Sequence, residues 1–157
     1  MTTLQRNSPF GIGVIAFVLV VGVSIGFYQF AYLPVIIAKP QISEDVLEPD
    51  RITEIMIVVG SSSPEQEENY IPKHAEIQLG LDNKVVWINE DAVVHTVTTD
   101  NDAVDKYSGL FDSLETAGLL KPGETYEFLF TQEGEFPYHC EPHPWMRGEI
   151  RVIKQKF

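Results

Sequence analysis

The chain has 157 residues and a mass of 17.7 kDa, with 44% apolar and 22% charged residues, which suits one globular domain plus a small additional segment. Its net charge of −12, from 23 acidic and 11 basic residues, repels a phosphate backbone and argues against DNA or RNA as a partner. The single cysteine excludes an intrachain disulfide and any site that needs two thiolates from one chain, such as four-thiolate zinc sites.

The N-terminal segment is apolar over a length that suits a membrane span. No Asp, Glu, Lys or Arg occurs in residues 7–38, and residues 10–31 are almost wholly apolar. A helix of that length extends about 33 Å, close to the bilayer hydrocarbon thickness, whereas the apolar part of a secretory signal has about 7 to 15 residues. Neither Ala31 nor Ala38 completes a good cleavage pattern. Residues 1–38 are therefore predicted to form a tail and membrane anchor, with a cleaved signal or a buried core helix as alternatives.

The charges that flank this segment predict its orientation. Arg6 lies on the short N-terminal side, and although Lys39 follows the span, the next four charges are acidic. The positive-inside rule then places the N-terminus inside the cell and the rest of the chain on the extracellular or periplasm-like side. Residues 39–50 are polar, acidic and flanked by prolines, so they are predicted to form a linker that precedes a domain over residues 51–157.

From residue 51 onward, short β-rich runs alternate with turn residues. In the clearest two-residue period, Tyr126, Phe128 and Phe130 share one face. In the absence of a long amphipathic helix, such runs predict an all-β sandwich or barrel of about 100 residues. The seven runs cover residues 52–59, 75–79, 84–89, 93–99, 125–131, 135–140 and 148–153.

The residues that can carry chemistry gather in the motif FPYHCEPHPWMRG near the C-terminus. Cys140, His143 and Met146 are spaced three residues apart, in a predicted loop whose prolines disfavour a helix. A thiolate, an imidazole and a thioether suit copper, and a site with one Cys, two His and a weak axial Met is typical of electron transfer. His95, on a separate predicted strand, can supply the second imidazole. Zinc binding and thiol catalysis are the alternatives.

The sequence between residues 70 and 153 resembles the cupredoxin family, particularly its plastocyanin-like and amicyanin-like members. The similarity lies in VVWINEDAVVHTV, GLFDS, LKPGETYEFLFTQEGEFPYHC and CEPHPWMRGEI, the last of which is similar to the short amicyanin ligand loop. The resemblance implies a Greek-key β-sandwich that binds one copper ion. It also implies that His95 and His143 are the imidazole ligands, Cys140 the thiolate ligand and Met146 the axial ligand.

Two neighbours of these ligands carry further expectations. Thr96 stands where many plastocyanin-like proteins have Asn, so its hydroxyl is expected to replace the usual side-chain hydrogen bond between the two ligand loops. His139 adjoins Cys140 on a predicted strand, and alternation along a strand directs neighbouring side chains to opposite faces. His139 is therefore expected to have a structural or surface role and not to bind the metal.

The ligand set predicts a type 1 (blue) copper protein that transfers one electron by cycling between Cu(I) and Cu(II). Four protein ligands leave no strong open position, so we expect an electron carrier and not an enzyme, with redox proteins as donor and acceptor. The exposed ring edge of His143, flanked by Pro142, Pro144 and Trp145, is the expected port for electrons. The alternatives are a membrane-tethered copper carrier or storage module, and an enzyme acting on a small gas or nitrogen oxide after displacement of Met146.

Overall fold

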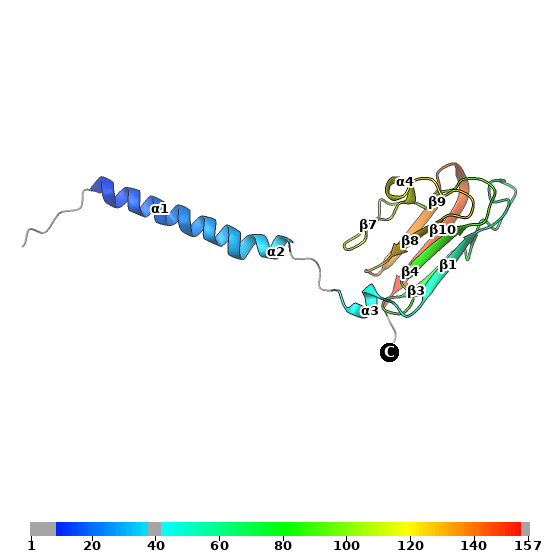
Figure 1. Cartoon of the computed structure of the whole chain (residues 1–157), viewed down its shortest axis with the longest axis horizontal. Coiled ribbons are helices and arrows are strands. Elements are labelled where there is room, and N and C mark those ends of the chain that lie inside the picture. Colours follow the sequence, from blue (N-terminus) through cyan, green and yellow to red (C-terminus); the bar gives the residue numbers. More distant parts are fainter. Residues whose placement is uncertain (1–8, 38–41, 155–157) are drawn as a thin grey trace, which may run out of the picture. The chain divides into compact units, whose positions relative to one another are not determined.

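Figure 1 shows the computed structural model of the chain, which describes residues 9–37 and 42–154. Contacts divide the chain into two compact units, Met1–Lys39 and Pro40–Phe157. The first unit is helical, and the second is built mainly of strands. The predicted tail at residues 1–8 and the first residues of the predicted linker lie outside the described residues.

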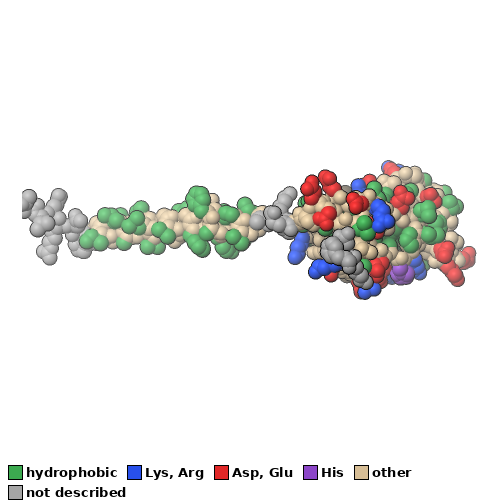
Figure 2. Space-filling view, turned by 90° about the horizontal axis from the view of Figure 1, so that it is seen from below, with side chains coloured by type: hydrophobic (Ala, Val, Ile, Leu, Met, Phe, Trp, Pro, Cys, Tyr) green, Lys and Arg blue, Asp and Glu red, His purple; other side chains and the backbone are tan. Residues whose placement is uncertain are grey.

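The first unit is one apolar helical segment. α1 (Pro9–Phe27) is followed directly by a π-helical stretch, η1 (Tyr28–Tyr32), and then by α2 (Leu33–Ile37). Over Gly11–Ile37 its mean hydropathy is 2.3, and it is long and apolar enough to cross a membrane. Apolar side chains project from it without an intervening charge, as Figure 2 shows, and those of its most apolar stretch are not buried. An exposed apolar surface of this length is typical of a helix that spans a membrane.

The second unit is a sandwich of two four-stranded sheets. β1 pairs with β4 in parallel, β3 pairs with β10 in parallel, and the neighbouring pairs are antiparallel. The first sheet has the order β2 (Tyr70–Ile71), β1 (Ile52–Ile57), β4 (Lys84–Asn89) and β8 (Thr125–Leu129). The second has the order β3 (His74–Gln78), β10 (His143–Ile153), β9 (Gly134–Cys140) and β5 (Thr98–Thr99). A short hairpin, β6 (Val104–Asp105) and β7 (Gly109–Leu110), precedes the helical turn α4 (Ser113–Thr116).

The core between the sheets is aromatic. Trp87 on β4 is fully buried, and its ring centroid lies 5.6 Å from those of Phe111, Tyr126 and Tyr138. The alternation predicted for β8 is confirmed, because Tyr126 and Phe128 are both buried. The predicted all-β sandwich is therefore correct, and the apolar face of each strand lines a single core.

Part of the predicted linker packs on this unit. Glu44–Leu47 form the single helical turn α3, in which Val46 is buried. The backbone carbonyl of Val46 accepts a hydrogen bond of 2.8 Å from the side-chain amide of Asn83, which is fully buried. The packed structure thus begins by residue 44, which is N-terminal to the predicted domain boundary at residue 51.

Two strands differ from the sequence prediction near the metal-binding motif. Of the run predicted over residues 93–99, only β5 pairs as a strand, while His95 forms an isolated bridge with Leu120. β10 begins at His143 and not at residue 148, so that His143 pairs with Cys140 across a tight turn. The register shifts between His143 and Arg147, a stretch in which Pro144 has no N–H to donate to a ladder. The predicted ligand loop is therefore the irregular first part of a strand.

Candidate metal centre

Cys140 lies at the end of β9, where the alternation of the strand points its side chain into the core. Its Sγ atom accepts a hydrogen bond of 3.3 Å from the backbone N–H of Thr96. Burial raises the pKa of the Cys140 thiol, and the hydrogen bond from Thr96 opposes this rise only in part. A bound metal cation favours the thiolate, so metal binding here would release a proton.

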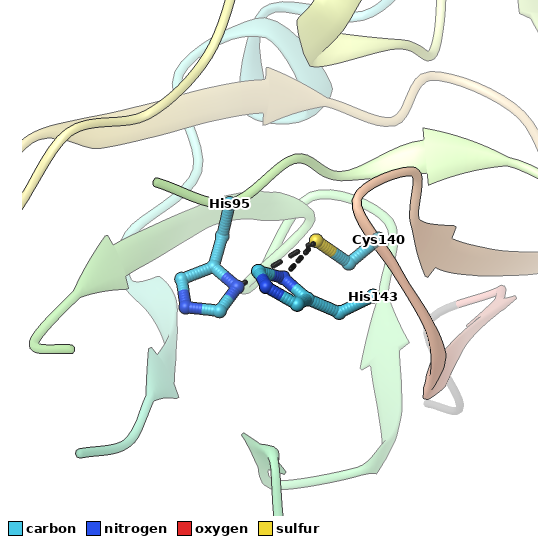
Figure 3. Close-up of side chains that lie close together, drawn as sticks. All are labelled: His95, Cys140 and His143. Carbon is cyan, nitrogen blue, oxygen red and sulfur yellow. Dashed lines mark hydrogen bonds between the residues drawn. The ribbon is translucent and has the colours of Figure 1, made fainter. Parts of the chain in front are cut away.

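Two imidazole rings converge on this sulfur, as Figure 3 shows. Nδ1 of His95 lies 3.6 Å from Sγ of Cys140, and Nδ1 of His143 lies 3.4 Å from the same atom. The three candidate ligand atoms all lie within 4.8 Å of one another, and two of the three residues are buried. Three of the four predicted ligands therefore lie together, although His95 is 45 positions away from Cys140 in the sequence.

Both imidazoles are poised to bind a metal in their neutral form. Burial lowers the pKa of His95, although its hydrogen bond with Asp91 acts in the opposite direction. Burial also lowers the pKa of His143, and the nearby His95 adds to this effect. Because metals bind only neutral imidazole, these shifts favour metal binding over protonation.

Met146, the predicted axial ligand, lies on β10 three residues after His143 and is fully buried. It belongs to the same buried apolar cluster as Cys140. An unbranched thioether packs well among aromatic and aliphatic side chains, so its burial alone is also what a core methionine would show. Its role as the fourth ligand stays a prediction.

Thr96 connects the two segments that supply the ligands. Its hydroxyl oxygen accepts a hydrogen bond of 2.9 Å from the backbone N–H of Glu141, directly after Cys140. Its backbone carbonyl accepts a hydrogen bond of 2.7 Å from the buried phenol of Tyr70. The backbone N–H of Thr96 also donates the hydrogen bond to Sγ of Cys140, so the Thr96 hydroxyl, N–H and carbonyl are all hydrogen-bonded. The expected threonine link between the two ligand segments is therefore present.

The other two residues of interest in the motif lie beside the centre. The His139 side chain turns away from Cys140 and contacts the carboxylates of Asp100 and Glu141, so it stands outside the cluster as expected. Trp145 is 39% exposed, and its ring centroid lies 5.4 Å from that of His143. The Trp145 indole N–H donates a hydrogen bond of 3.1 Å to the carbonyl of Ser61, which ties the ligand segment to the turn after β1.

Sequence analysis did not single out Asp91, which contacts a candidate ligand. Its Oδ2 atom lies 3.0 Å from Nε2 of His95, on the side of the ring opposite to Nδ1. Burial of the carboxyl group raises the pKa of Asp91, but hydrogen bonds from Gly60, His95, Ala92 and Ser62 outweigh this effect and lower the pKa to about 2. The available signal was an acidic residue four positions before the histidine, a spacing that is informative only once the turn geometry is known.

The sequence profile of copper-binding proteins of the plastocyanin/azurin family matches residues 60–153, a stretch that contains every predicted ligand. The chain belongs to this family. One thiolate and two imidazoles are the soft and borderline donors that suit copper, and here they converge in a buried cluster. Copper is therefore the cofactor of this plastocyanin/azurin-family protein, and His95, Cys140 and His143 are the residues that would hold it.

Individual relatives agree with this family assignment. The chain is 32% identical to amicyanin from Paracoccus denitrificans over 78 residues, which are 49% of this chain and 54% of the relative. It is 36% identical to the chloroplastic plastocyanin of Chlamydomonas reinhardtii over 87 residues, which are 53% and 57% of the two chains. The chain thus spans about half the length of these curated relatives.

Among solved structures, the chain is similar to a novel purple cupredoxin from Nitrosopumilus maritimus, with a TM-score of 0.51 and 27% identity. The match covers 64% of this chain and 99% of that chain. A whole cupredoxin therefore superposes on part of this protein, and the predicted cupredoxin-like sandwich is confirmed.

Proposed function

We propose that this protein is a type 1 copper electron carrier that passes one electron between redox proteins. The observation that carries the proposal is the meeting of Cys140 with two imidazole nitrogens within 4.8 Å inside an aromatic core. Bound copper supplies a Cu(I)/Cu(II) couple at such a set of donors. The chain contributes a rigid frame, because β9, β10 and the bridge between His95 and Leu120 hold the ligands in one arrangement.

The proposed route for electrons runs through the exposed side of the centre. His143 is half-buried, and Pro142, Pro144 and Trp145 beside it are exposed. An apolar surface around a ligand ring allows a redox partner to approach without a buried charge pair at the contact. We therefore propose that donor and acceptor proteins both dock over this surface.

A copper carrier or storage module is the competing function, and redox cycling of the full chain in detergent separates the two. An electron carrier is expected to be reduced and reoxidised repeatedly, with full recovery of its visible absorption and with copper retained after gel filtration. The physical reason is that a rigid ligand set binds both oxidation states with little rearrangement. Release of copper to a chelator on each reduction, without recovery of the absorption, would instead support copper delivery.

We propose that the protein is not an enzyme, and the support comes from the burial of Met146, the predicted axial ligand of the metal. Met146 is fully buried in the core cluster, so a small gas or nitrogen oxide could approach the site from the Met146 side only by displacing packed side chains. A catalytic copper site needs an open coordination position. Burial of Met146 therefore supports electron transfer over reaction with a small substrate.

We also propose that the apolar helix retains the protein in a membrane, with the copper domain on the extracellular or periplasm-like side. Support comes from its length and mean hydropathy of 2.3 over Gly11–Ile37. Protein from native cells is expected to stay in the membrane fraction after an alkaline carbonate wash and to be released by detergent. Sequencing of its N-terminus should find the helix still present. An N-terminus that begins within residues 32–40, with the protein in the soluble fraction, would identify a cleaved signal instead.

A further inference from the structure

Asp91 is a buried carboxylate with four hydrogen-bond donors around it. It follows β4 and is 4% exposed. Oδ1 accepts hydrogen bonds from the backbone N–H groups of Gly60 at 2.9 Å and of Ala92 at 2.8 Å. Oδ2 accepts one from the N–H of Ser62 at 3.2 Å and lies 3.0 Å from Nε2 of His95. Three backbone groups thus fix the carboxylate, which in turn fixes the imidazole ring.

This contact selects one tautomer of His95. An ionised carboxylate only accepts hydrogen bonds, so the imidazole nitrogen that faces Asp91 must carry the proton. With the proton on Nε2, the lone pair of Nδ1 is free, and Nδ1 is the atom that lies 3.6 Å from Sγ of Cys140. Carboxylates that hold a ligand histidine in this way orient the ring and make it a stronger donor.

The charge of Asp91 is not balanced by a basic side chain. Among the described residues, His95 is its ion-pair partner, and neither Lys nor Arg lies within salt-bridge distance. A buried negative charge acts through a low effective dielectric constant and favours the more positively charged state of a nearby centre. Cu(II) carries one more positive charge than Cu(I).

We propose that Asp91 is a positioning residue that presents Nδ1 of His95 to the copper and lowers the reduction potential of the site. The proposal rests on the assignment of the protein as a redox copper carrier. On this proposal, the Asp91 carboxylate, which the turn after β1 holds in place, is one of the groups that determine the reduction potential of the copper. The same turn is tied to Trp145 through Ser61, so one segment supports the surroundings of both histidines.

The test compares the midpoint potentials of copper-loaded Asp91→Asn and Asp105→Asn, each in the full chain in detergent at one neutral pH. Asp105 is a matched control because it is a buried carboxylate that accepts several hydrogen bonds from groups outside the metal centre. Its donors are Tyr107, Ser108 and Thr131. Asp91→Asn is expected to shift the potential to a more positive value, whereas Asp105→Asn leaves it unchanged. An unchanged potential in Asp91→Asn, or an equal shift in both variants, would overturn the proposal.

A second measurement does not depend on a variant that folds or on redox activity. Nitrogen-15 chemical shifts of His95 in the metal-free wild-type chain report which ring nitrogen carries the proton. The proposal requires the Nε2–H tautomer, and a predominant Nδ1–H tautomer would overturn it. If the wild-type protein releases copper on reduction, the proposed electron-transfer function fails, and the tautomer still decides whether Asp91 positions His95.

Discussion

Cys140→Ser is expected to remove nearly all of the intense visible absorption of the copper-loaded protein. The absorption of such sites arises from charge transfer between a thiolate and Cu(II), and serine offers neither a soft donor nor an ionised one at neutral pH. His95 and His143 remain in the variant, so some copper can stay bound without the colour. The measurement is an absorption spectrum of the oxidised full chain, normalised to the copper content of the same sample.

His139→Ala is the matched control for this experiment. It alters the adjacent residue of β9, whose side chain contacts Asp100 and Glu141 and lies outside the metal cluster. We expect the control to keep both its copper and its colour. A Cys140→Ser spectrum that matches the wild type would remove Cys140 from the metal centre and with it the proposed type 1 copper site.

Gly148→Ala is expected to destabilise the copper domain by about 3 kcal/mol, at the upper end of the usual cost of overpacking a core. A Cβ atom at this position would lie 2.4 Å from both Cζ and the hydroxyl oxygen of Tyr138. The Tyr138 ring has no room to retreat, because it is fully buried against the rings of Tyr70, Trp87 and Phe111. Denaturant unfolding of the metal-free protein, followed by near-ultraviolet circular dichroism, measures the change.

Gly134→Ala is the control, since Gly134 is a strand glycine of the same sheet at which an added Cβ would meet a less severe contact. Its added Cβ would lie 3.1 Å from Cε2 of Phe136, a contact that a shift of a few tenths of an ångström relieves. We expect a loss below about 1 kcal/mol for this variant. Equal losses for the two glycines would contradict the assignment of the cost to the contact with Tyr138, because the backbone-entropy effect of replacing glycine by alanine favours the folded state at both positions.

Much of the fold and of the metal centre follows from local patterns in the sequence. Two-residue alternation identified the buried face of β8, because side chains along a strand point alternately to opposite sides. The spacing of Cys140, His143 and Met146 indicated copper, because few other sites use a thiolate, an imidazole and a thioether within one short segment. The charge-free N-terminal stretch likewise indicated a membrane span from length and composition alone.

Tertiary structure decided the relations between segments that are distant in the sequence. The register of β10 on β9 brings Gly148 against Tyr138, where a larger side chain would clash. This contact explains why a glycine stands within the strand, which no local sequence pattern indicated. The hydrogen bonds that Thr96 makes to Cys140 and Glu141 exist only because the two ligand segments meet. The physical reason is that spacing along a chain determines which side chains share a face of one strand. Contacts across a core depend instead on the pairing and packing of whole strands, as the placement of Asp91 behind His95 shows.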